Sequence, residues 1–214
     1  MGTKMKAFIY TGGKILPENI TEAPDKDDIA IAADSGYHSA RLLGVTPDIL
    51  LGDFDSIGAD LGKLDANTEI IKVPAEKDFT DTQLAVDTAL KKGANEIIII
   101  GGLDGRLDHT LSNLSILEDM WDKKIFCHIT NGFNRVRLID STSTLIPKSQ
   151  FKYLSIIAIS KLLKGVEIKG CKYPLSNAKI EKNFQFAVSN EIEGNCALIS
   201  VRKGRAYIVE STES

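Results

Sequence analysis

The first 124 residues alternate short apolar segments with segments of helical pattern, and this alternation restricts the fold more than any other feature of the sequence. The apolar segments are almost continuously apolar, which is typical of strands buried on both faces of a parallel sheet. They are Ala7–Tyr10, Ile29–Ala32, Ile49–Leu51, Glu69–Val73 and Glu96–Ile100. Because strand, loop and helix follow one another in this rhythm, we predict an N-terminal α/β domain with a mainly parallel sheet and Rossmann-like layers.

Two of the intervening segments carry helix signals. Thr80–Lys92 opens with Thr80-Asp-Thr-Gln83, which matches a capping box, and ends at Gly93. After Gly105, four leucines and Trp121 recur at helical spacing. We therefore predict one helix in each segment.

After about residue 124 the pattern changes to short β-rich segments that are separated by turn residues. They are Ile125–Thr130, Val136–Ile139, Thr144–Ile146, Tyr153–Ile159, Val166–Ile168, Phe184–Val188, Ala197–Val201 and Ala206–Val209. This spacing is typical of an all-β sandwich or barrel. We predict two domains, residues 1–132 and 133–214, with the junction near Asn131-Gly132.

Composition narrows the class of protein. A hydrophobic content of 43% and a charged content of 26% are typical of globular chains. The net charge of −3 argues against a dedicated nucleic-acid-binding protein, which needs a basic surface. This total is uneven, because residues 1–132 carry 22 acidic and 13 basic residues and residues 133–214 carry 7 and 13. The acidic excess lies where we predict metal-binding carboxylates.

The sequence predicts a cytoplasmic location. The N-terminus does not resemble a signal peptide, and the apolar runs are too short to span a bilayer. The cysteines at 127, 171 and 196 are few, odd in number and without a Cys-x-x-Cys pair, so they predict reduced thiols rather than disulfides or a zinc site.

Polar groups follow every predicted strand of the first domain. They are Thr11-Gly12-Gly13, Asp34-Ser35-Gly36, Gly52-Asp53-Phe54-Asp55-Ser56, Lys77-Asp78-Phe79-Thr80-Asp81 and Gly101–His109. In open α/β sheets, ligands bind at the carboxyl ends of the strands. We therefore expect these groups to converge on one crevice.

The carboxylates among these groups suit a hard cation. Asp53 and Asp55 are two residues apart at a strand end, and carboxylate oxygens are ligands that Mg²⁺ prefers. The alternative is that both are turn or capping carboxylates. Asp78 and Asp81 flank a predicted helix start, where capping alone could explain one of them.

The loop Gly101–His109 predicts a phosphate site. Its two leading glycines let backbone approach a ligand closely, the following helix offers free N–H groups, and Arg106 can grip phosphate oxygens in a bidentate manner. The alternative is a glycine-rich turn with Arg106 on the surface, and the role of His109 beside Asp108 stays open. The sequence has no P-loop, dinucleotide or nucleophile-elbow motif. The motif set favours metal-assisted phosphoryl or pyrophosphoryl transfer.

In this order, the motifs resemble the thiamine pyrophosphokinase family. The resemblance covers nearly the whole chain, because it continues through Gly170–Leu175, Ser189-Asn190-Glu191, Gly194 and Gly204. It implies an α/β domain, a β-sandwich-like domain, and a homodimer with active sites between subunits. It also implies the reaction of ATP with thiamine to give thiamine diphosphate and AMP.

The resemblance also implies roles for individual residues. Asp53, Asp55 and Asp81 would hold Mg²⁺, and Arg106 would stabilise charge on the transferring group. The residues implied to contact ATP are Gly12, Gly13, Asp34, Gly36, Asp78, Thr80, Gly101, Gly102, Arg106, Asp108 and His109. Asp81 or another carboxylate of the site would accept the proton of the thiamine hydroxyl.

Tyr173, Ser189, Asn190 and Asp81 are the residues that the resemblance implies for thiamine. Many family members have tryptophan where this chain has Tyr173, and either ring can stack on a cation. Without the resemblance, Tyr173 would be an exposed sandwich-edge residue and Ser189-Asn190 a turn.

Two alternatives stay open at this point. A phosphatase of the haloacid dehalogenase type also uses Asp-x-Asp after an apolar strand, although Ile57 stands where Thr or Val is usual. The other alternative is a nucleotide- or thiamine-binding protein without turnover.

Overall fold

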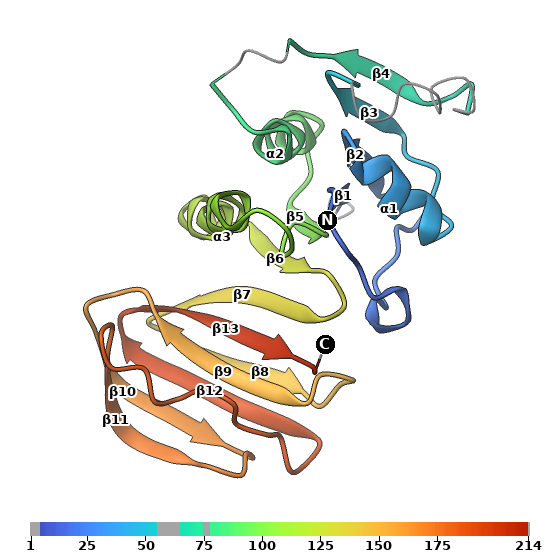
Figure 1. The fold of residues 1–214 in the computed structure, drawn as a ribbon. Coiled ribbons are helices and arrows are strands. Elements are labelled where there is room, and N and C mark those ends of the chain that lie inside the picture. The colour runs from blue at the N-terminus through green and yellow to red at the C-terminus, as the bar shows by residue number, and fades with distance from the viewer. Residues whose placement is uncertain (1–4, 55–64, 75–77, 214) are drawn as a thin grey trace. The chain divides into compact units, whose positions relative to one another are not determined.

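The chain divides into two compact units, Met1–Gly132 and Phe133–Ser214. The structure is a computed structural model that describes residues 5–54, 65–74 and 78–213. In the first unit a parallel sheet carries helices on both faces, and in the second unit the described secondary structure is entirely β (Figure 1). The predicted fold class, α/β followed by all-β, is confirmed.

The strands of the first unit form a parallel sheet in the order β4-β3-β2-β1-β5-β6. They are β1 (Lys6–Tyr10), β2 (Ile29–Ala33), β3 (Ile49–Gly52), β4 (Glu69–Lys72), β5 (Glu96–Ile100) and β6 (Phe126–Thr130). From β1 the chain passes to β2 on one side and later returns to β5 on the other side. The strand order therefore reverses next to β1, and this is where open α/β sheets bind ligands.

The helices cover both faces of this sheet. They are the 3-10 helix η1 (Pro17–Asn19) and the α-helices α1 (Gly36–Leu42), α2 (Asp81–Lys91) and α3 (Leu107–Asp122). Helix α1 packs on one face, where Tyr37 and Ala40 join the core with Phe8 and Tyr10, and α2 and α3 lie on the other face (Figure 1). Among the described residues, no helix combines the length and apolar character needed to cross a membrane.

The predicted capping box at the start of α2 is confirmed. The Thr80 hydroxyl accepts a hydrogen bond from the Gln83 backbone N–H at 3.2 Å. The Thr80 backbone N–H donates to the Gln83 side chain at 3.1 Å. These bonds fix the point at which the chain enters α2, next to the carboxyl ends of the strands.

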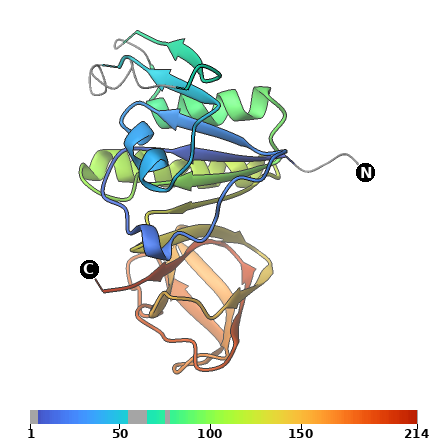
Figure 2. The same ribbon diagram turned by 90° about the vertical axis from the view of Figure 1, so that its right-hand side faces the viewer.

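The second unit consists of two antiparallel sheets, β7-β13-β9 and β11-β10-β12-β8 (Figure 2). Their strands are β7 (Asn134–Asp140), β8 (Ser143–Pro147), β9 (Tyr153–Ala158), β10 (Leu162–Lys169), β11 (Leu175–Glu181), β12 (Cys196–Lys203) and β13 (Arg205–Ser211). Side chains of both sheets, among them Ile156, Ile199 and Ile208, share one buried core. This is the arrangement of a β-sandwich.

Three sequence predictions differ from the structure. Ile125–Thr130 was grouped with the β-rich segments, but its strand β6 pairs in parallel with β5. Phe184–Val188 was predicted as a strand but lies in an irregular segment. Strand β11 was not predicted, because its Ser-Asn-Ala-Lys centre has weak strand propensity.

A buried carboxylate lies between β7 and β13. The side chain of Glu210 is 3% exposed, and Arg135 donates to it through Nε and Nη2, both at 2.9 Å. Arg137 Nη2 donates to the same carboxylate at 2.6 Å, and the Ser149 hydroxyl lies at 3.3 Å. One buried acid thus receives hydrogen bonds from two arginines and one serine.

Candidate functional site

A cavity of about 360 Å³ lies where the carboxyl ends of β1, β2 and β5 meet the start of α2 and α3. Its walls come from four segments of the first unit, within residues 11–13, 33–35, 80–82 and 102–113. The lining residues are Thr11, Gly12, Gly13, Ala33, Asp34, Ser35, Thr80, Asp81, Thr82, Gly102, Asp104, Gly105, Arg106, His109 and Asn113. The predicted convergence of strand-end groups therefore holds for four of the five groups.

The loops after β1 and β5 are hydrogen-bonded to each other. The Gly102 N–H donates to the Gly12 carbonyl at 3.1 Å, and the Lys14 N–H donates to Asp104 Oδ2 at 3.1 Å. Asn113, which is 4% exposed, donates through Nδ2 to the Gly102 carbonyl at 2.9 Å. A side chain at Gly102, where φ is +68°, would collide with this amide. The glycine turn is thus fixed in a form that brings bare backbone to the cavity.

Two aspartates reach the cavity from strand and helix ends. Asp34 follows β2 with a left-handed φ of 46°, and its N–H donates to the Leu51 carbonyl at 2.7 Å. Asp81 occupies the first turn of α2, where the helix dipole favours a carboxylate. Both side chains are half-buried.

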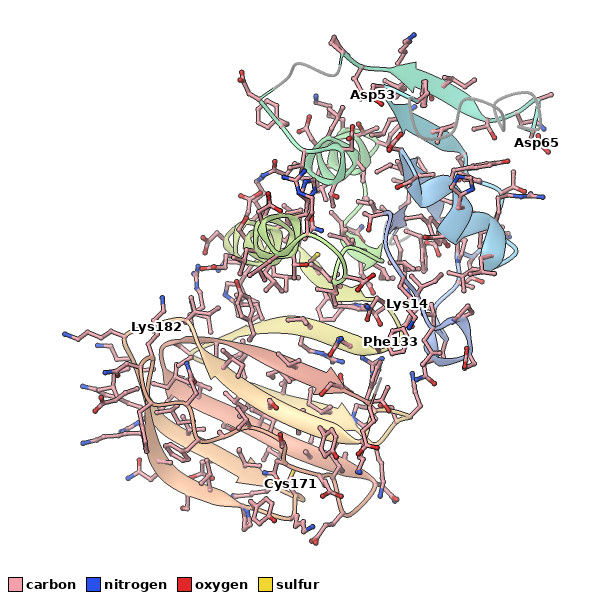
Figure 3. The ribbon with its side chains drawn as sticks, viewed as in Figure 1. Lys14, Asp53, Asp65, Phe133, Cys171 and Lys182 are labelled. Atoms are coloured by element: carbon pink, nitrogen blue, oxygen red, sulfur yellow. The ribbon has the colours of Figure 1, made fainter. Side chains whose placement is uncertain are left out.

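Asp53 lies after β3 (Figure 3) and does not line this cavity. Phe54 next to it is buried and has a left-handed φ of 68°. Asp55, the second predicted metal ligand of the pair, lies outside the described residues. Within the described ranges, no group of three histidine, cysteine or acidic side chains is close enough to hold a metal ion.

Arg106 is the N-cap residue of α3 and makes no capping hydrogen bond through its side chain. Its guanidinium instead donates to Asp108, through Nε at 3.1 Å and through Nη2 at 2.6 Å. The hydrogen bond from Arg106 lowers the pKa of Asp108 to about 2. Arg106 lines the cavity and Asp108 does not, so Asp108 contacts the guanidinium from a position outside the cavity lining.

The structure thus brings together only part of the predicted ATP-site residues. Gly12, Gly13, Asp34, Thr80, Gly102, Arg106 and His109 line one cavity, together with Asp81, which was predicted as a metal ligand. Gly36, Asp78, Gly101 and Asp108 are their chain neighbours but do not line it. Gly36 has a packing role, because a Cβ there would overlap the carbonyl oxygen of Tyr10 where α1 meets β1.

A larger hollow of about 490 Å³ lies between α2 and α3, away from the strand ends. Its floor is apolar, and its charged rim residues pair with each other as Lys91–Asp87 and Lys123–Asp119, both at 2.6 Å. The smaller cavity, with its glycine turns, carboxylates and helix ends, is the better candidate for polar chemistry.

The second unit has a cavity of about 250 Å³ at the predicted thiamine residues. It is lined by Ile168, Tyr173, Leu175, Phe186, Ala187, Val188 and Asn190. Tyr173 is 59% exposed, and Phe186 and Val188 are each 44% exposed. Such a concentration of exposed apolar side chains is typical of a binding surface. Ser189, the third predicted residue, is exposed beside this cavity with a φ of 56°.

Sequence reasoning missed several lining residues. Asn113 lies seven residues after Arg106 on the same helix, and nothing in its spacing marks it as polar core. Phe186 and Val188 were assigned to a strand, but they lie in an irregular segment and line the cavity together with Ala187.

Comparison with known families gives two matches. The family model "Thiamin pyrophosphokinase, catalytic domain" matches residues 21–129, and "Thiamin pyrophosphokinase, vitamin B1 binding domain" matches residues 142–205. The first match contains the strand ends after β2, β3 and β5, and the second contains Tyr173, Ser189 and Asn190.

Individual relatives agree with these matches. A thiamine pyrophosphokinase of Bacillus subtilis is 31% identical over 209 residues, which cover 96% of this chain and 98% of that one. Thiamin pyrophosphokinase 1 of Caenorhabditis elegans is 30% identical over 173 residues, covering 77% and 70%. A crystal structure of the Bacillus subtilis thiamine pyrophosphokinase superposes with a TM-score of 0.87 at 28% identity, covering 99% and 100%. None of these matches supports the phosphatase alternative.

Proposed function

Because the chain belongs to the thiamin pyrophosphokinase family, we propose that it transfers a pyrophosphoryl group from ATP to the hydroxyl of thiamine. The products are thiamine diphosphate and AMP. The observation that carries this proposal is the cavity at the reversal point of the parallel sheet, within the part of the chain that matches the family's catalytic domain.

The cavity has features that suit the binding of a nucleoside triphosphate. The turns at Gly12-Gly13 and Gly102 offer bare backbone, and the start of α3 carries the positive end of a 16-residue helix. Arg106 adds a guanidinium that can contact phosphate oxygens in two places. We propose that the first unit is the ATP-binding domain, with Thr80 and His109 completing the site.

The acidic side chains suit a magnesium ion in kind, although no three of them within the described ranges lie close enough together to form a site. Asp34, Asp81 and Asp104 bring carboxylate oxygens to one cavity, and oxygen ligands are those that Mg²⁺ prefers. We propose that Asp53, Asp55 and Asp81 hold the ion, with Asp78 near them. When bound, Mg²⁺ would neutralise charge on the ATP phosphates.

The chain's own residues then have defined tasks. The thiamine oxygen forms a bond to the β-phosphorus of ATP, the bond between that phosphorus and the oxygen of AMP breaks, and the hydroxyl proton passes to a carboxylate of the site, Asp81 or a neighbour. Arg106 binds the oxygens of the transferring group, which hold more negative charge as AMP leaves.

We propose that the cavity of the second unit binds thiamine. Its lining suits a planar cation, because the face of the Tyr173 ring is negative and Phe186 and Val188 supply apolar walls. A cation already contacts this ring, since Lys172 Nζ lies 5.7 Å from its centroid.

A homodimer with active sites at the subunit interface is part of the proposal. Each unit has exposed apolar side chains close in sequence to residues of its candidate site, namely Leu107 (69%) and Leu111 (57%) on α3, and Phe184 (69%), whose ring contacts Phe186, on the second unit. Exposed apolar patches of this kind mark interfaces.

We also propose a cytoplasmic location, because the three cysteines are free.

Incubation with ATP and thiamine, with and without Mg²⁺, tests the function. We expect AMP and thiamine diphosphate in equal amounts, measured by chromatography, and no product after chelation of the metal. Release of inorganic phosphate without AMP would overturn the proposal.

A pair of variants on α2 tests the site. Asp81→Asn should lower turnover by roughly 100-fold or more, as expected when a group that acts on transition-state charge is removed. Asp87→Asn is the matched control, because Asp87 is on the same helix, does not line the cavity and pairs with Lys91 at the surface. Equal activity of the two variants would remove Asp81 from the site.

A further inference from the structure

The side chain of Asn190 is buried and forms hydrogen bonds through both its oxygen and its nitrogen. The residue is 4% exposed, and its Oδ1 accepts hydrogen bonds from the backbone N–H groups of Tyr173 at 2.9 Å and Glu191 at 3.0 Å. Its Nδ2 donates to the carbonyl of Tyr173 at 2.8 Å. Both polar ends of the amide are thus bonded to backbone, and two of the three bonds go to one residue.

The backbone of Asn190 is fixed as well. Its N–H and carbonyl form a reciprocal pair with Leu154 of β9, at 3.0 and 2.7 Å. The side chain therefore extends from an anchored point of the sandwich. A short, buried amide on a fixed backbone has little freedom, so it can determine where its partner lies.

The position of Tyr173 depends on its hydrogen bonds with Asn190. Tyr173 lies between the end of β10 at Lys169 and the start of β11 at Leu175, and it belongs to neither strand. Its ring is 59% exposed, so packing holds the ring weakly. The following residue is Pro174, which keeps the Tyr173 backbone extended. The hydrogen bonds from Asn190 fix that extended backbone in place.

We propose that Asn190 is a positioning residue, which holds the backbone of Tyr173 so that the phenol ring faces the cavity of the second unit, and that it does not itself bind thiamine. This inference rests on the proposed function, because it assigns the ring of Tyr173 to the thiamine cation. It replaces the direct contact with thiamine that the family resemblance implied for Asn190.

The chain offers a matched control for this arrangement. Gln185 also forms a two-point hydrogen bond to backbone, since its Oε1 accepts from the Ala158 N–H at 3.1 Å and its Nε2 donates to the Ala158 carbonyl at 3.2 Å. Gln185 does not line the cavity. Removing either amide deletes the same kind of contact from the same unit.

The test compares Asn190→Ala with Gln185→Ala. Asn190→Ala should raise the KM for thiamine roughly 3- to 30-fold, the range expected for loss of a cation–π contact, with kcat and the KM for ATP unchanged. Gln185→Ala should leave all three constants unchanged. A change in kcat or in the KM for ATP alone would overturn the proposal.

A double-mutant cycle separates positioning from direct binding. If Asn190 acts only through the ring, Asn190→Ala should have no further effect on the thiamine KM in a Tyr173→Ala background. Effects that multiply would show that Asn190 contacts thiamine itself. If Asn190→Ala does not fold, Asn190→Asp takes its place, since it keeps the Oδ1 acceptor and replaces the Nδ2 donor by a carboxylate oxygen that cannot donate to the Tyr173 carbonyl.

A structural readout keeps this inference distinct from the proposed function. The NMR signals of the Tyr173 ring should shift or broaden in Asn190→Ala and not in Gln185→Ala, whether or not the enzyme turns over. Unchanged Tyr173 signals would overturn the inference. Absence of AMP formation by the wild-type protein would overturn the function alone.

Discussion

Replacing Glu210 by glutamine should lower the stability of the second unit by about 3–5 kcal/mol, the usual cost of breaking a buried ion pair. The carboxylate is 3% exposed, and it accepts hydrogen bonds from Arg135 and Arg137 at 2.6–2.9 Å. Their side chains are only 14% and 16% exposed. A neutral amide would leave two guanidinium charges close together in a poorly hydrated place, and it cannot accept a bidentate contact from Arg135 with both of its atoms.

Urea unfolding measures this effect. With a urea dependence of about 2 kcal/mol per molar, a loss of 3–5 kcal/mol moves the midpoint down by about 1.5–2.5 M. The sole tryptophan, Trp121, is in α3 of the first unit, so its fluorescence follows that unit, whereas circular dichroism reports both. We expect the shift in the β-sheet signal.

The matched control is Glu213→Gln. Glu213 lies 2.7 Å from Lys152, but both side chains are exposed, at 70% and 48%. Such surface pairs contribute about 0–1 kcal/mol, so the midpoint should move by less than about 0.5 M. If the two variants unfold at the same urea concentration, burial is not what makes the Glu210 interaction strong and the reasoning fails.

Three further changes test the first unit. Asp108→Asn should raise the KM for ATP by the same factor at pH 5 and at pH 8. The reason is that Arg106 lowers the pKa of Asp108 to about 2, so the carboxylate stays ionised and paired at both pH values and loses its charge only as the pH falls through about 2. A factor that differs between pH 5 and pH 8 would contradict this. Gly36→Ala should lower the free energy of unfolding by about 1–3 kcal/mol through overlap with the end of β1, measured in urea. Asn113→Ala removes the hydrogen-bond donor to the carbonyl of Gly102, which costs about 1–3 kcal/mol. It should weaken ATP binding about 5- to 150-fold, measured by calorimetry. Unchanged affinity would show that the turn at Gly102 does not need this hydrogen bond.

Much of the first unit could be predicted because its strands, apart from the exposed edge strand β4, are buried on both faces. Continuous apolar runs such as Ile97–Ile100 are typical of buried strands in a globular chain, and the capping box at Thr80 marks where α2 begins. Helix α1 was missed, since seven residues with a leading glycine give too few turns for a periodic signal.

The second unit was harder, because a sandwich strand is half exposed and its pattern depends on what covers it. Phe184, Phe186 and Val188 alternate like a strand, yet Phe186 and Val188 face a cavity and their segment is irregular. Strand β11 escaped notice because pairing with β10, rather than its own composition, makes it a strand.

The residues of the candidate sites likewise divide into those that the sequence could indicate and those that only the tertiary structure reveals. Residues that follow strands, such as Asp34, could be found from order along the chain, since strand ends converge in this fold. Asn113 could not, because its role comes from the close approach of α3 to the turn at Gly102. For Asn190 the sequence motif marked the residue, and only the hydrogen bonds to Tyr173 suggest its task.

The left-handed backbone of Asp34 also bears on any attempt to evolve a more heat-resistant form of this enzyme. A non-glycine residue in that conformation costs about 1–2 kcal/mol, and glycine would remove the cost. A library selected by thermal survival alone would therefore enrich Asp34→Gly, which deletes a carboxylate of the cavity. Laboratory selection for robustness would remove a residue of the proposed ATP site, so each round has to be screened for product as well as for survival.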